Sequence, residues 1–86
     1  MAVDRRVKSK PEEYLDEIRR LMLSRFPDAQ FETRRIGRNE FRIYVTADFE
    51  DLFDILDVTS QRRIDILDDA GTHIQVVPTR RSETLN

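Results

Sequence analysis

The sequence contains no cysteine and no tryptophan, and it has one histidine, three prolines and two glycines. Without cysteine the chain has no disulfide, no thiolate zinc site and no thiol nucleophile. Such a composition fits a reducing compartment, so we expect a cytoplasmic protein. The glycines, Gly37 and Gly71, stand far apart, so no glycine-rich phosphate loop is present. P-loop and dinucleotide-binding folds are therefore excluded.

Long apolar runs and a strong excess of one charge are also absent. Uninterrupted apolar segments are only a few residues long, whereas a membrane-spanning helix needs about 20, so we expect no membrane span. The 15 basic and 17 acidic residues give a net charge of −2, and nucleic-acid-binding domains are usually basic. With 86 residues, 38% apolar and 37% charged, the chain is expected to form one small domain.

Residues that could carry catalysis or hold a metal are few. His73 is the single histidine and has no cysteine or serine beside it. The tetrapeptide DILD occurs twice, at 54–57 and 65–68, and on one straight helix the two copies would lie about 16 Å apart, too far to share a cation. A break at 58–60 would bring them closer. We therefore predict a protein that is not an enzyme and that needs no metal and no cofactor.

The first regular segment predicts a helix that follows Ser9 and is ended by Pro27. Ser9 and Glu12 form a capping box, and Pro11 suits a first helical turn. Apolar residues recur at helical spacing; they are Leu15, Ile18, Leu21, Met22 and Phe26.

Two strands are predicted next, at 29–36 and 41–47. The connection between them contains Gly37, Arg38 and Asn39, residue types that favour a tight antiparallel hairpin. Alternation sorts the second strand into two faces: Phe41, Ile43 and Val45 on one, and Arg42, Tyr44 and Thr46 on the other.

A second helix is predicted over 48–57, capped by Asp48. Its expected buried row is Phe49, Leu52, Phe53 and Leu56. Residues 61–70 fit two structures, a third helix capped by Ser60 and stopped by Gly71, or the first strand of a hairpin. The three-residue spacing of Ile64, Leu67 and Ala70 favours the helix. The last strand is predicted at 73–77, ending at Pro78.

The expected fold is therefore a small two-layer α+β domain of order α-β-β-α-(α)-β, with a three-stranded sheet and the helices on one face. The alternative order, with a final hairpin, is α-β-β-α-β-β. Residues 1–10 are expected to form a flexible N-terminal arm, 11–78 the domain, and 79–86 a flexible C-terminal tail.

The expected order is similar to that of bacterial-type KH domains, which hold single-stranded RNA with a GxxG loop between two helices. The corresponding stretch here, VTSQRR at 58–63, has no glycine, so only the order of elements is similar. Residues 25–45 also look like the opening of minimal nucleotidyltransferases, but the Gly-Ser pair and the strand-borne aspartates of that family are missing. We assign the chain to neither family.

The leading functional prediction is a non-catalytic module that binds a protein or a second copy of itself, with a homodimer as one form. A two-layer fold leaves one sheet face uncovered, and that face would carry the interface residues Arg42, Tyr44, Thr46, His73 and Gln75. The helix with Phe49, Leu52 and Phe53 is the other expected contact surface.

The second functional prediction is binding of RNA or single-stranded DNA. Five arginines would form one positive patch if the hairpin tip and the C-terminal tail lay at the same end of the sheet. They are Arg34, Arg35, Arg38, Arg80 and Arg81. Tyr44 would add a ring on which a base could stack.

Overall fold

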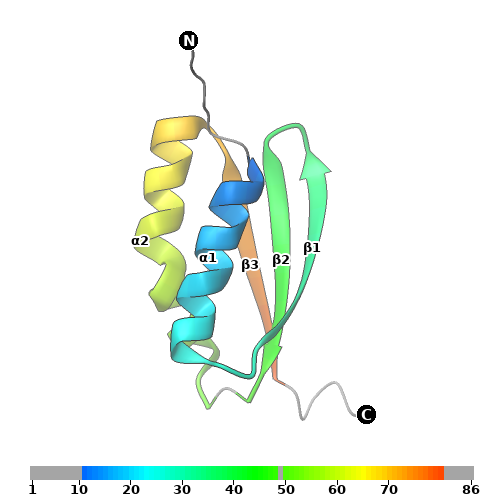
Figure 1. Ribbon diagram of the computed structural model, residues 1–86, viewed down its shortest axis with the longest axis vertical. Helices are drawn as coiled ribbons and strands as arrows, with labels where there is room; N and C mark the ends of the chain where they lie inside the picture. The colour runs from blue at the N-terminus through cyan, green and yellow to red at the C-terminus, as the bar shows by residue number, and fades with distance from the viewer. Residues whose placement is uncertain (1–10, 49, 81–86) are drawn as a thin grey trace.

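The structure is a computed structural model, and it describes residues 11–48 and 50–80. Two helices cover one face of a three-stranded sheet (Figure 1). The elements follow the order α1 (Pro11–Arg25), β1 (Gln30–Gly37), β2 (Glu40–Ala47), α2 (Leu52–Ala70) and β3 (His73–Arg80). The α+β class, the three-stranded sheet and the one-sided arrangement of the helices are as predicted. Within the described residues, neither helix is long and apolar enough to cross a membrane.

The central strand of the sheet is β2, which pairs antiparallel with β1 and parallel with β3. The β1–β2 hairpin has the predicted turn, with a one-residue irregularity between Arg35 and Gly37. A parallel pair needs a long crossover connection, and α2 supplies it. Both β1 and β3 are therefore edge strands.

The core lies between the sheet and the helices. On β2 the predicted alternation holds, because Phe41, Ile43, Val45 and Ala47 are buried while the residues between them are only half-buried. The predicted apolar face of α1 also holds, since Leu15, Ile18 and Met22 are buried and Leu21 and Phe26 pack against the core. The predicted cap of α1, Ser9, lies outside the described residues.

Residues 61–70 are helical, as the three-residue spacing favoured, but they belong to one helix with residues 52–60. The alternative final hairpin is wrong, and the chain does not break at 58–60. A single helix of 19 residues thus replaces the two predicted ones. The stretch compared with the KH loop, 58–63, lies inside this helix.

The start of α2 differs from the prediction by one turn. Asp51, not Asp48, is the N-cap: its backbone is extended (φ −128°, ψ 119°) and its side chain accepts a hydrogen bond from the Phe53 amide at 2.9 Å. Asp48 follows directly on β2, three residues before the cap. Several acids in this segment suit a helix start equally well, so composition could not choose among them.

The inward face of α2 matches the prediction only in part. Ile55, Thr59 and Ile66 are buried, whereas Phe53 and Ile64 are 69% and 53% exposed. Leu52 and Leu56 pack against the core as expected, and Phe49 lies outside the described residues. The helix carries two apolar rows, and contact with α1 and β3 decides which row is buried.

Thr59 lies in the buried row and keeps its hydroxyl hydrogen-bonded. Its Oγ1 donates to the Leu56 carbonyl at 3.2 Å and accepts from Arg63 Nε at 3.0 Å. A buried polar group that has found its partners in this way is tolerated in a core.

The strand β3 continues through Pro78 to Arg80, three residues beyond the predicted range of 73–77. An edge strand tolerates proline because the missing N–H can fall on the unpaired side. The regular structure therefore extends past the predicted domain boundary at residue 78, and the rest of the predicted tail, 81–86, lies outside the described residues, as does the predicted arm, 1–10.

Gly71 ends α2 in the left-handed conformation, with φ 68°, and its N–H donates to the Leu67 carbonyl at 2.9 Å. An added Cβ would meet no atom within 4 Å, so replacement affects only the backbone conformation. We expect Gly71→Ala to lower the free energy of unfolding by about 1 kcal/mol, measured by urea denaturation. Gly71→Asn is the matched variant and should lose less, because asparagine tolerates this conformation. Equal losses for both would contradict the assignment.

Candidate functional site

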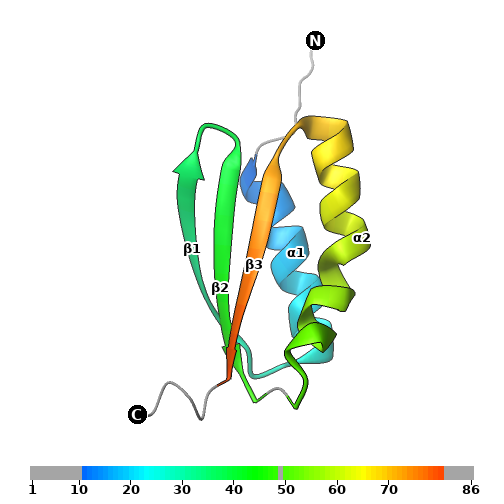
Figure 2. The same ribbon diagram turned by 180° about the vertical axis from the view of Figure 1, so that it is seen from behind.

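The sheet face away from the helices carries all five residues predicted as an interface. Arg42, Tyr44 and Thr46 alternate with buried residues of β2, and the register places Gln75 beside Arg42 and His73 beside Glu40. Figure 2 shows this face with β1, β2 and β3 in front of α1. No helix of the described chain covers it.

Hydrogen bonds join the polar side chains of this face into one network. Arg42 Nε donates to Gln75 Oε1 at 3.1 Å, and Gln75 Nε2 donates to Glu40 Oε2, also at 3.1 Å. His73 Nδ1 lies 3.5 Å from the same Glu40 oxygen. The side chains are thereby held in place, and the face is polar and close to neutral.

Tyr44 lies between two arginines on this face. The guanidinium carbons of Arg34 and Arg42 are 5.6 Å and 5.9 Å from its ring centroid, within range of a cation–π contact. Arg34 also donates two hydrogen bonds to Glu32 Oε2, at 3.0 Å and 2.8 Å. The hydrogen bonds and charge of Glu32 raise the pKa of Arg34, which stays charged.

The predicted arginine patch is spread along the sheet. Arg35 binds the hairpin carbonyls of Gly37 and Arg38, each at 3.0 Å. Arg38 lies at the hairpin turn, whereas Arg80 pairs with Ala47 at the other end of β2, about 23 Å away along the strand. The structure thus brings Arg34 to Tyr44, but it places Arg38 and Arg80 at opposite ends. Arg81 and the side chain of Arg80 lie outside the description.

The two DILD segments lie on the continuous helix α2, so corresponding aspartates are three turns, about 16 Å, apart. In the part of the chain that the structure describes, no three His, Cys, Asp or Glu side chains lie close enough to hold a metal ion.

A second surface lies on α2, the helix that was expected as the other contact surface; Phe53 belongs to it as predicted, whereas Ile64 and Leu67 were not predicted. Three large apolar side chains are exposed there, Phe53 at 69%, Ile64 at 53% and Leu67 at 44%; we call them the α2 row. Because helical residues turn by about 100° each, the α2 row and Ser60 project within about 60° of one another. The three side chains therefore lie on one side of the helix, with Ile64 and Leu67 one turn apart and Phe53 about 16 Å before Ile64.

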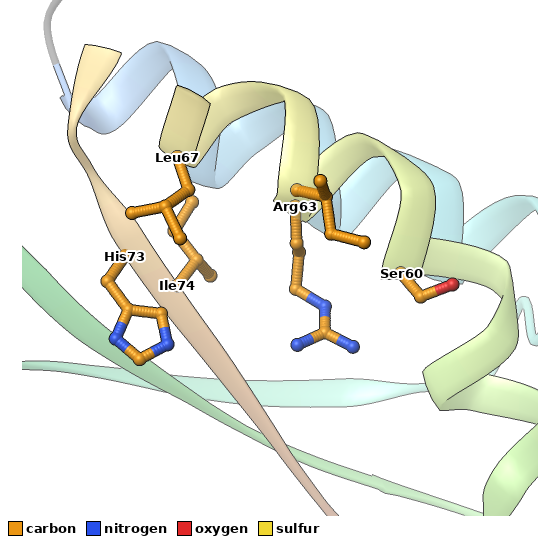
Figure 3. A pocket seen from close by; sticks show the side chains of 6 residues that line it. Ser60, Arg63, Leu67, His73 and Ile74 are labelled. Carbon is orange, nitrogen blue, oxygen red and sulfur yellow. The ribbon is translucent and has the colours of Figure 1, made fainter. Parts of the chain in front are cut away.

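A cavity of about 250 Å³ adjoins this row between α2 and β3. Its lining is Ser60, Arg63, Ile64, Leu67, His73 and Ile74, and Figure 3 shows the Arg63 side chain reaching from the helix into the space beside β3. In both overall views α2 lies on the side of β3 away from β1 (Figure 1, Figure 2). The cavity thus opens beside a free strand edge.

Arg63 is the charged residue of this cavity. Burial lowers the pKa of Arg63, which means that its charged form is partly desolvated. Its Nε donates to Thr59, and among the described residues no carboxylate forms an ion pair with it. By contrast, Arg62 on the neighbouring side binds Glu17 of α1 through two nitrogens. Within residues 11–48 and 50–80, Arg63 is therefore a cation without a counter-ion, at the edge of an apolar surface.

Fold and surfaces together define a two-layer α+β domain with an uncovered polar sheet face and an exposed apolar helix row. Comparison with known proteins finds no matching family model, no matching curated protein and no matching solved structure.

Proposed function

We propose that the protein is a non-catalytic interaction module that binds a protein partner through the α2 row. The observation that carries this proposal is the exposure of Phe53, Ile64 and Leu67 on one side of one helix. Scattered exposed apolar residues are ordinary, but several on one side of one helix favour a surface that another protein covers. The absence of cysteine supports a cytoplasmic location for this module.

Burial by a partner would also relieve two unfavourable features of the isolated domain. Complete burial of a large apolar side chain stabilises by about 1.5–3 kcal/mol. The α2 row has three such side chains that are partly exposed. A partner carboxylate would supply the counter-ion that Arg63 lacks among the described residues. An apolar centre with a charged pair at its margin is the usual composition of a protein interface.

Site-specific photo-crosslinking in cells that naturally make the chain tests the proposal. A photoreactive amino acid at position 64 or 67 should give an adduct with a protein, because these side chains would lie inside the interface. The same amino acid at Arg20, an exposed position on α1, is the matched control and should give none. If positions 53, 64 and 67 all fail to give an adduct, the α2 row is not an interaction surface.

Single-stranded nucleic acid is a second candidate ligand, for the other surface. The arginines on either side of Tyr44 support it, because a base can stack on such a ring while guanidinium groups contact phosphates. Glu32 and Glu40 offset this charge, which makes the candidate weaker. Fluorescence anisotropy with a labelled 12-nucleotide RNA at low salt tests it. Binding should be lost in Tyr44→Ala and Arg34→Glu but kept in Arg38→Glu, and no binding by the unmodified chain would remove the candidate.

A further inference from the structure

We infer that the partner of the α2 row presents an extended segment, which pairs with the free edge of β3 and lies beside α2 as a fourth strand of the sheet. The inference rests on the proposed function, because it names how the partner contacts that surface. It also defines the chemistry of the segment: a large apolar side chain for the cavity and an acidic residue for Arg63.

The outer edge of β3 has backbone groups without partners in the part of the chain that the structure describes. The His73 amide donates to the Asn39 carbonyl at 2.8 Å, so the backbone N–H of His73 points toward β2. Backbone groups of successive strand residues point to opposite edges, so those of Ile74, Val76 and Pro78 point away from β2. Pro78 fits this direction, because a strand proline keeps its missing N–H on the unpaired side. Ile74 and Val76 therefore each offer an N–H and a carbonyl to another strand.

The helix α2 extends past this edge of the sheet. In both overall views it lies beyond β3, on the side away from β1 (Figure 1, Figure 2). A fourth strand would lie about 4.8 Å beyond β3, next to the part of α2 where Ile64 and Leu67 are 53% and 44% exposed. Such a strand would satisfy the backbone of β3 and cover these two side chains together. A docked helix would cover the side chains but leave the strand edge unpaired.

The cavity between α2 and β3 suits a side chain of such a strand. Its volume of about 250 Å³ is below the ~300–1,000 Å³ of pockets that hold small-molecule ligands. Ile64, Leu67 and Ile74 give it an apolar wall, and Figure 3 shows Leu67 of α2 next to Ile74 of β3. Side chains of a strand alternate between two faces, so every second residue of the added strand would point toward α2. A large apolar residue at one of these positions would fill the cavity.

Arg63 determines the charge of the segment. Its Nε donates to Thr59 at 3.0 Å, and no described residue accepts from its other nitrogens. Figure 3 shows its guanidinium group in the space beside β3, where a carboxylate could accept from the free N–H groups. Arg63 and Leu67 are one helical turn, about 6 Å, apart, which matches the ~6.6 Å between alternate residues of a strand. The expected segment therefore has an acidic residue two positions from a large apolar one.

Selection from a phage-displayed library of random decapeptides, with the full chain as the target, tests the inference. The selected peptides should share the predicted pattern, an acidic residue two positions from a large apolar one. Ile64→Glu should weaken their binding by about 10-fold or more, because it places a carboxylate beside the apolar contact. Leu23→Glu, at a partly exposed position of α1, is the matched control and should bind them unchanged. Thermal unfolding of each variant checks that it is folded.

Backbone N-methylation of a selected peptide shows whether it binds as a strand, and it leaves the protein unmodified. In an added strand every second peptide N–H points at β3. Methylation at these positions should weaken binding by about 10-fold or more, because it removes a hydrogen bond and leaves a carbonyl of β3 unpaired. Methylation at the positions between them should change the dissociation constant much less. Fluorescence anisotropy with the labelled peptide measures both sets.

The contact with Arg63 is tested by changing the peptide and the protein together. Replacing the peptide carboxylate with its amide should weaken binding to the unmodified chain by about 10-fold. The same replacement should have little effect on binding to Arg63→Met, which has no charge to pair. Arg63→Lys, which keeps the charge, should retain part of the preference for the acid. Equal effects of the replacement in all three proteins would show that Arg63 does not contact the carboxylate.

The outcomes separate this inference from the proposed function. If the library yields no binding peptide, if Ile64→Glu does not affect binding, or if methylation weakens binding without alternation, the inference is overturned. Self-association of the chain without peptide binding also overturns it. When photo-crosslinking at position 64 or 67 still captures a protein in these cases, the proposed function remains. No peptide together with no adduct at positions 53, 64 and 67 overturns both.

Discussion

Replacing Ile43 with alanine is expected to lower the free energy of unfolding by about 2–5 kcal/mol. Ile43 lies in the middle of the central strand, has no exposed surface and belongs to the core cluster with residues of both helices. The truncation removes apolar contacts and leaves a cavity that the rigid centre of the sheet cannot close. For a domain this small, the loss is a large share of the total stability.

Urea denaturation at one fixed chain concentration measures this effect, because any dimer adds stability that depends on concentration. Ile36→Ala is the matched control: the same residue type lies 41% exposed at the irregularity of β1. It should change the unfolding midpoint much less. Similar midpoints for the two variants would show that Ile43 is not at the centre of the core.

The second large effect is expected for Thr59→Val. The substitution keeps the shape of the side chain but removes the hydroxyl that accepts from Arg63. A half-buried guanidinium nitrogen then loses its partner, so we expect a loss of about 1–3 kcal/mol. Thr59→Ser, which keeps the hydroxyl, should preserve the hydrogen bond and lose only the contacts of one methyl group.

A double-mutant cycle separates the hydrogen bond from the packing of Thr59. In Arg63→Met the desolvated charge is gone, and Thr59 still donates to the Leu56 carbonyl. Thr59→Val should therefore cost clearly less in the Arg63→Met background than in the unmodified chain. An equal loss in both backgrounds would mean that the two side chains are not coupled.

The strand β2 and the helix α1 were predictable because the spacing of their apolar residues is compatible with only one type of element and one buried face. The alternation of β2 fits only a strand with one buried face, and the apolar spacing of α1 fits only one helical face. α2 is different, because it carries one row through Ile55, Thr59 and Ile66 and another through Phe53, Ile64 and Leu67. The predicted buried row combined Leu52 and Leu56, which pack against the core, with Phe53, which is exposed. Packing against α1 and β3 decides which residues of the helix are buried.

The arginines were misplaced for a related reason. Whether Arg38 and Arg80 lie at one end of the sheet depends on the direction in which β3 pairs, and local spacing does not encode that direction. The 19-residue helix before β3 was the available signal, since a helical crossover usually joins parallel strands. Parallel pairing with β2 then puts the end of β3 far from the hairpin turn.

The parallel pairing also orders the events of folding. The turn of the β1–β2 hairpin has two residues. Glu40 and His73, by contrast, are paired although they lie 33 residues apart in the sequence, with α2 between them. Closing a longer loop loses more chain entropy, so the hairpin is expected to form early and β3 to dock late. On a ribosome, Ile74 and Val76 are the last of the described core residues to emerge, and they complete the core. Until they do, α2 has no strand to pack against, and the nascent chain remains open to aggregation and to proteases.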